Sequence, residues 1–162
     1  MNPVLLDLLP YVRQGYCCSQ LLMLLALREC GREAPELVRA MNGLCHGLGF
    51  SGGPCGLLTG GAAVLGMLAG KDAEREALPC LNPVVNDYAH WFSERTAPFG
   101  GCSCEHVATG LQGEAGQISA PFAEKNISPQ NIPDPLLCGD LLAQCWEQVR
   151  VLAYDYELDM NP

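Results

Sequence analysis

Apolar side chains recur at helical spacing along most of the chain, and no stretch shows the strict alternation that is typical of a β-strand. The pattern predicts a first helix with apolar positions from Val4 to Val12, kinked or interrupted by Pro10 and closed by Gly15. Further helices are expected over residues 17–30, 35–47, 56–69, 83–96, 104–110 and 135–158. We therefore expect an all-α fold, a single-domain bundle of about six or seven helices that spans residues 1–162.

The central stretch, residues 47–70, organises this bundle. It reads GLGFSGGPCGLLTGGAAVLGMLAG, a glycine-rich loop that turns at Pro54, presents Cys55 and then runs without a charge to Gly70. A helix without a charged face is buried on all sides, and its small residues allow neighbouring elements to approach its axis. The pattern thus predicts a thiol at the buried start of a central helix.

One segment departs from helical periodicity. Residues 110–135 contain three glycines and four prolines, and their apolar positions show little regular spacing. Irregular segments of this length in a compact domain are usually functional lids or mobile loops. We expect an irregular loop here, near which a redox partner protein or cofactor docks.

Charge and hydropathy narrow the range of partners and compartments. Nine basic residues against eighteen acidic ones give a formal charge of −9, which argues against nucleic acid and against an anionic membrane surface. The apolar core from Leu57 to Ala69 is shorter than the ~20 residues that a bilayer requires, so no membrane insertion is expected. The first residues, MNPVLLDLLPYVRQG, carry no basic region before their apolar stretch, which favours a cytoplasmic protein over a secreted one.

Ten cysteines are the compositional exception. In a reducing compartment such a number indicates metal, cluster or redox chemistry rather than structural disulfides, although some of the ten will pack as small apolar residues. Four share a placement: Cys18, Cys55, Cys104 and Cys138 each fall at the start of a predicted helix. Unpaired N–H groups and the helix dipole stabilise a thiolate there, so we expect the pKa of these thiols to lie below ~8.5.

Three motifs and a late cysteine resemble a known family. GYCCSQ at residues 15–20, the glycine-rich run into CGLLTG at 55–60, FGGCSC at 99–104 and a cysteine on the last helix are similar to the C_GCAxxG_C_C family, which is called redox-active largely because of its cysteines. The resemblance covers about residues 12–152. Leu57 stands where the family usually has alanine. By motif position the family cysteines are Cys18, Cys55, Cys104 and Cys138, with Cys145 as the substitute for Cys138.

The resemblance implies a small electron-transfer or redox-sensing domain. Four thiolates from four helices are expected to ligate an iron–sulfur cluster, with backbone N–H groups of the glycine-rich region, at Gly52, Gly53 and Gly56, as cofactor-binding donors. The same four sulfurs would equally suit a structural Zn²⁺. The sequence has no CxxC pair, the strong signature of either site.

Two alternatives remain open. Cys102 and Cys104 would serve as the catalytic thiols of a thiol–disulfide protein, since residues two apart in an extended segment lie on one face. Vicinal Cys17 and Cys18 would require a strained peptide for the same chemistry. The second alternative is a zinc or interaction module without turnover. The uncharged central helix and the apolar last helix also make a homodimer plausible.

Overall fold

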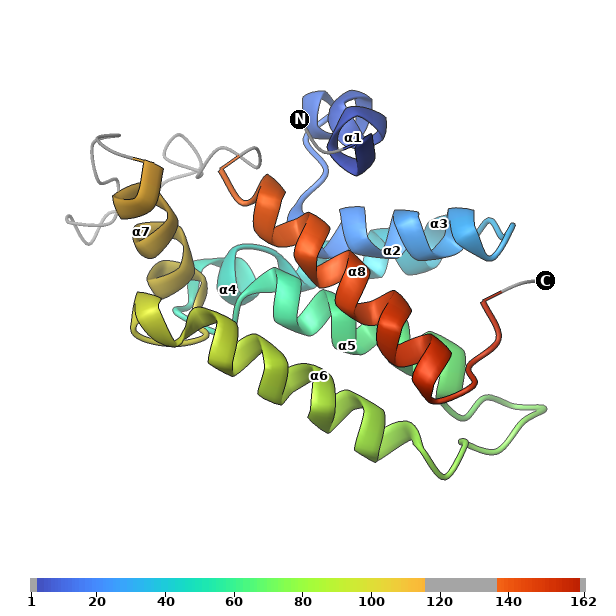
Figure 1. Ribbon diagram of the computed structural model, residues 1–162. Helices are drawn as coiled ribbons and strands as arrows, with labels where there is room; N and C mark the ends of the chain where they lie inside the picture. The colour runs from blue at the N-terminus through green and yellow to red at the C-terminus, as the bar shows by residue number, and fades with distance from the viewer. Residues whose placement is uncertain (1–2, 116–136, 161–162) are drawn as a thin grey trace.

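The computed structural model describes residues 3–115 and 137–160, and this part of the chain is helical (Figure 1). The helices are α1 (Pro3–Arg13), α2 (Cys18–Glu29), α3 (Pro35–Met41), α4 (Cys45–Phe50), α5 (Gly56–Ala69), α6 (Leu81–Thr96), α7 (Cys104–Ala115) and α8 (Gly139–Asp155), with short 3₁₀ turns at Asn42–Leu44 and Ala97–Phe99. Within the described ranges seven of these are right-handed helices, and α4 is a left-handed turn. The all-α prediction is confirmed.

The uncharged helix α5 lies at the centre of the bundle. It packs against α2, α6 and α8, and Figure 1 shows α8 crossing it while α6 runs along its other side. Leu57, Val64 and Leu65 are completely buried there, which confirms the predicted core helix. A search of the described helices finds none with the length and apolarity needed to cross a membrane.

Glycines on α5 allow its neighbours to come close. A Cβ atom on Gly60 would lie 2.9 Å from the Cα of Ser19 on α2, and one on Gly61 would collide with the ring of Tyr88 on α6. The Tyr88 hydroxyl donates a hydrogen bond of 2.9 Å to the carbonyl of Leu57, one turn earlier on α5. The small residues of α5 therefore allow both α2 and α6 to pack closely against its axis.

Several of the expected helix boundaries differ from the structure, and the helix expected over residues 35–47 ends at Met41, before the 3₁₀ turn Asn42–Leu44. Pro10 lies inside α1 without ending it, and the last helix begins at Gly139 rather than at Pro135. The prediction that an irregular loop begins at residue 110 is wrong, because α7 continues to Ala115 although it contains Gly110 and Gly113. The rest of the expected loop, residues 116–136, lies outside the described residues.

The glycine-rich segment predicted as a loop folds into the left-handed turn α4. His46, Gly47, Leu48, Gly49 and Phe50 all have positive φ, between 54° and 67°. L-residues pay roughly 1–2 kcal/mol each in this conformation, whereas glycine adopts it freely. The two glycines reduce the total cost, and the rings of His46 and Phe50 stack at 4.7 Å across the turn.

Candidate functional site: a thiol cluster and a neighbouring disulfide

Four cysteines lie at helix starts, as predicted. Cys18 and Cys104 are the first residues of α2 and α7, and Cys55 and Cys138 are the N-cap residues of α5 and α8. Cys145 lies within α8 and is completely buried.

Backbone contacts bring the segments around Cys55 and Cys104 together. Pro54 and Ser103 form an antiparallel bridge, the Cys55 N–H donates to the Cys102 carbonyl at 2.8 Å, and the Cys104 N–H donates to the Gly53 carbonyl at 3.2 Å. This short pairing fixes the start of α7 beside the start of α5.

Two glycines lie where the helix starts meet. A Cβ atom on Gly56 would lie 3.8 Å from the Cβ of Cys18, a van der Waals distance, so the start of α2 lies against the start of α5. A Cβ atom on Gly47, in the left-handed turn, would lie 3.0 Å from the Cβ of Cys104. The starts of α2, α5 and α7 consequently meet in one region.

The thiols in this region interact electrostatically. A hydrogen bond with Cys138 raises the pKa of Cys18 well above its ordinary value, and burial and the charge of Cys138 raise it further. Burial raises the pKa of Cys55 well above its ordinary value, followed by repulsion from Cys18, and Cys104 and Cys145 add smaller contributions. We name these five residues the thiol cluster: Cys18, Cys55, Cys104, Cys138 and Cys145.

The expectation of lowered thiol pKa values at the helix starts is wrong for three of the four predicted residues. The backbone N–H of Leu57 does lower the pKa of Cys55, but burial outweighs it. Burial, followed by the charge of Cys18, raises the pKa of Cys104 to about 11. Cys18 is raised as well. A buried thiolate loses its hydration, and a neighbouring thiolate repels it. Together these two effects raise the pKa by more than the N–H groups and dipole of the helix start lower it.

The side chains of the thiol cluster do not form a metal site as they are arranged. Across residues 3–115 and 137–160, no three His, Cys, Asp or Glu side chains converge as a metal ion would require. Of the predicted glycine donors, Gly53 uses its N–H in a 3.0 Å bond to the Gly47 carbonyl. Gly56 lies against the start of α2, and Gly52 has a positive φ of 80° in the turn before Pro54. The described residues thus hold no preformed metal site, and the iron–sulfur cluster or Zn²⁺ stays a prediction.

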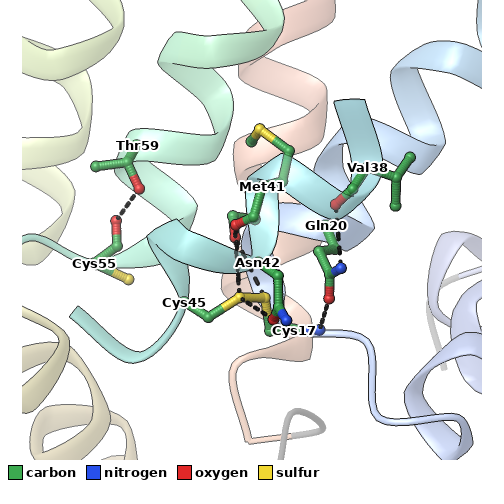
Figure 2. The surroundings of a disulfide bond; sticks show 9 residues. Cys17, Gln20, Val38, Met41, Asn42, Cys45, Cys55 and Thr59 are labelled. Carbon is green, nitrogen blue, oxygen red and sulfur yellow. Dashed lines mark hydrogen bonds between the residues drawn. A yellow bond between two sulfur atoms is a disulfide. The ribbon is translucent and has the colours of Figure 1, made fainter. Parts of the chain in front are cut away.

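A disulfide joins Cys17 to Cys45 immediately beside the cluster (Figure 2). It links the residue before α2 to the first residue of the left-handed turn, 28 positions later, with the two Cα atoms 6.0 Å apart. Both residues are buried, at 5% and 3% exposure. Since Cys17 bonds to Cys45, the considered vicinal pairing of Cys17 with Cys18 does not occur.

Oxygen atoms surround the two sulfurs. The Ser19 hydroxyl lies 3.3 Å from the Cys17 sulfur and 3.4 Å from that of Cys45, and it donates to the Met41 carbonyl at 2.8 Å. The side-chain oxygen of Asn42 lies 3.4 Å from the Cys45 sulfur, and the Met41 carbonyl lies 3.7 Å from it. These oxygens accept hydrogen bonds from S–H groups, which exist only when the bond is reduced. The surroundings thus accommodate two thiols as well as a disulfide.

Gln20 connects this pair to two helices. Cys17 is the N-cap residue of α2, and Gln20 completes a capping box in which the Cys17 N–H donates to the Gln20 side-chain oxygen at 3.2 Å. The Gln20 side-chain nitrogen donates to the Val38 carbonyl on α3 at 3.1 Å, as Figure 2 shows. One side chain thereby joins Cys17 to the neighbouring helix.

The structure gives the predicted dithiol Cys102 and Cys104 no bond to each other, and both are free thiols. The Cys102 sulfur lies 3.4 Å from the Thr96 hydroxyl, while Cys104 belongs to the thiol cluster. Cys45 is the functional residue that the sequence did not predict, because its spacing is that of an apolar position on the expected helix. Its place two residues before the first glycine of the glycine-rich segment was the one available signal.

Comparison with known proteins gives one finding. The family model described as "Putative redox-active protein (C_GCAxxG_C_C)" matches residues 16–152. Neither the curated proteins nor the solved structures contain a match.

Proposed function

The chain belongs to the C_GCAxxG_C_C family, whose model covers most of its length, and from this premise we propose that it is a thiol–disulfide redox protein in which Cys17 and Cys45 are the reactive pair. The observation that carries the proposal is the disulfide at the start of α2, with oxygen acceptors placed for both of its thiol protons. The Asn42 and Met41 oxygens can accept the Cys45 thiol proton and the Ser19 hydroxyl can accept that of Cys17, so the reduced pair keeps hydrogen-bond partners.

The redox step is a two-electron exchange with a protein dithiol. A thiolate of the partner attacks the Cys45 sulfur, forms a mixed disulfide and releases Cys17 as a thiolate, which takes up a proton. The partner's second thiol then displaces Cys45, so the partner ends as a disulfide and this chain as two thiols. Two electrons and two protons pass to the chain, and the reverse sequence reoxidises it.

The location of Cys17 favours it as the leaving group. Its sulfur faces the backbone N–H of Gln20 at the start of the 12-residue helix α2. Burial is similar for both sulfurs, so the helix start favours negative charge on Cys17 relative to Cys45, whose oxygen neighbours favour its protonated form, and a better-stabilised thiolate leaves faster. Cys45 contacts the side chain of Asn42, an exposed residue, and an attacking thiol is expected to approach from this side.

The test is a redox titration of the full chain with thiol counting. In dithiothreitol buffers of increasing reducing strength, two thiols are expected to appear together, and mass mapping of a non-reduced digest should join the peptides of Cys17 and Cys45. Cys45→Ser should abolish this transition, whereas Cys102→Ser and Cys80→Ser should keep it. An unchanged two-thiol transition in Cys45→Ser would overturn the proposal.

The iron–sulfur hypothesis is the second candidate, and the electrostatic contact among the cluster thiols supports it. Binding a cation would remove the mutual repulsion that raises these pKa values. As arranged, however, the side chains do not fit a metal, so their rearrangement would have to accompany binding. Anaerobic purification decides this question: a brown protein with absorbance near ~400 nm that Cys55→Ser abolishes would support a cluster, and a colourless protein free of iron and zinc would refute both metals.

A further inference from the structure

A cleft of about 790 Å³ lies among α1, α2 and the start of α3, outside the thiol cluster. Figure 1 shows α1 on the side of α2, and α1 also contacts α8. Pockets that bind small molecules usually enclose about 300–1,000 Å³, so this cleft has the size of a ligand site. The redox proposal makes no use of it, and the inference below does not depend on that proposal.

The charge of the cleft is opposite to that of the protein. Three arginines, Arg28, Arg32 and Arg39, and one acidic residue, Glu33, line it, whereas the whole chain has a formal charge of −9. Asp7 already pairs with Arg28 at 3.2 Å. In the described part of the chain, the side chains of Arg32 and Arg39 form no salt bridge or hydrogen bond. The lining thus carries an excess of positive charge, and such an excess beside low-dielectric walls attracts the opposite charge.

The remaining lining is apolar and aromatic. Leu8, Leu27 and Val38 are buried among the walls, and the rings of Tyr11 and Tyr16 meet edge to face at 5.7 Å. Apolar walls with a few convergent polar groups are typical of sites for small organic ligands. An inorganic anion alone would leave these walls unused.

We propose that this cleft binds a small organic anion, with an aromatic or aliphatic body against Leu27, Val38 and the tyrosines and with a carboxylate, sulfonate or phosphate group at Arg32 and Arg39. Guanidinium groups bind such anions in a bidentate manner, and these two side chains have no competing partner among the described residues. The ligand is a free molecule rather than a membrane lipid, because the surface of the protein as a whole is acidic.

The test uses two fluorescent probes that differ in one charge. 8-Anilinonaphthalene-1-sulfonate carries a sulfonate, and N-phenyl-1-naphthylamine has the same rings without it. We expect the full chain to bind one equivalent of the sulfonate and to bind it about tenfold or more tightly than the neutral probe. Arg32→Gln and Arg39→Gln should each remove most of this preference and leave the affinity for the neutral probe unchanged.

The control variant is Arg75→Gln, which removes an exposed arginine from the α5–α6 connection outside the cleft. It should bind both probes as the unaltered chain does, and thermal unfolding followed by circular dichroism should confirm that all three variants fold. Equal affinities for the two probes, absence of binding, or unchanged sulfonate affinity in Arg32→Gln and Arg39→Gln would each overturn the proposal. Displacement of the probe by phosphatidylglycerol vesicles would also overturn it, since it would assign the cleft to a lipid headgroup.

Discussion

Burial governs the chemistry of the individual thiols. Cys104 is at the start of a helix, where N–H groups favour a thiolate, yet its pKa is raised to about 11 because burial and the charge of Cys18 act in the opposite direction. Burial raises the pKa of Cys145, deeper in the same region, to about 12, although its interaction with the Tyr88 side chain acts in the opposite direction. Raised pKa values keep Cys18, Cys55, Cys104 and Cys145 protonated at neutral pH and inert as nucleophiles unless a partner or a cation alters their surroundings.

The alkylation rate of Cys104 tests this conclusion. With a pKa of about 11 instead of the ordinary 9.0, the folded chain should hold about a hundredfold less Cys104 thiolate at pH 8 than the unfolded chain does. Iodoacetamide labelling followed by mass spectrometry should show correspondingly slow modification, with a rate that climbs until about pH 11. Cys18→Ser should lower the pKa, because it removes the repelling charge. Labelling of folded Cys104 at the unfolded rate would contradict the prediction.

The same shift has a consequence for stability. The folded chain keeps the Cys104 proton in a range where the unfolded chain has lost it, so stability falls as pH rises between about 9 and 11. Below pH 9 this thiol contributes its full effect to the stability of the fold.

Glycine has different roles in different elements. On α5, Gly61 provides the space that the Tyr88 ring occupies, whereas Gly66 on the same helix has no atom within 4 Å of where a Cβ would lie. In α4, Gly47 and Gly49 both supply positive φ, but only Gly47 is also in close contact with its surroundings. Substitutions at the two glycines of each helix therefore distinguish the effect of packing from the effect of backbone conformation.

Alanine substitutions in α5 should have opposite effects. Gly61→Ala forces α6 away from α5 and should lower the free energy of unfolding by about 3 kcal/mol, near the upper end of the usual cost of overpacking. Gly66→Ala should raise it by about 0.5–1 kcal/mol, since alanine is the better helix former and meets no obstacle. Urea denaturation measures both values. A similar loss of stability in both variants would show that crowding against Tyr88 is not the cause.

Alanine substitutions at the two glycines of α4 should differ in how much stability they cost and in whether they affect Cys104. Gly49→Ala should cost about 1–2 kcal/mol, because only the left-handed conformation opposes it. Gly47→Ala should cost about 1–2 kcal/mol more, because its Cβ would also lie 2.8 Å from the Gly53 carbonyl oxygen and 3.0 Å from Cys104. The alkylation rate of Cys104 should change in Gly47→Ala and remain unchanged in Gly49→Ala. The prediction fails if both variants leave this rate at its original value.

For the molecule as a whole, the Cys17–Cys45 bond links two regions that are far apart in the sequence and joins α2 to the left-handed turn. The chain-entropy effect of closing a loop 28 residues long stabilises the folded state by about 3–4 kcal/mol. The free energy of this bond is therefore a large part of the stability of an ordinary domain, about 5–15 kcal/mol.

Thermal unfolding with and without dithiothreitol measures this contribution. The oxidised chain should have a Tm roughly 10 °C above that of the reduced chain. Cys17→Ser and Cys45→Ser should each unfold at one temperature whether or not reductant is present, and Cys80→Ser should retain the difference. If reductant lowers the Tm of Cys45→Ser as much as that of the unaltered chain, another pair of cysteines is responsible.

Local sequence signals were sufficient for the helices and insufficient for the pairing of sulfurs. Apolar periodicity located the buried helix α5, and the cysteines at helix starts followed from the same pattern. The handedness of residues 46–50 was not predictable, since glycine permits positive φ without requiring it, and His46, Leu48 and Phe50 ordinarily oppose it. The disulfide partner of Cys17 depends on how α2 and the left-handed turn α4 contact each other, and the spacing of residues in the sequence does not predict that contact.

The carboxamide of Gln20 has one further consequence, because it touches the Cys17 backbone and also lines the cleft beside Arg39 and Asn42. Asn42 itself contacts the Cys45 sulfur, so Gln20 and Asn42 belong both to the walls of the cleft and to the surroundings of the sulfur pair. Thermodynamic reciprocity then applies to any molecule held there: a tenfold preference for the oxidised chain over the reduced one lowers the midpoint potential of the pair by about 30 mV. The occupant of the cleft would in this way adjust how readily the chain accepts electrons.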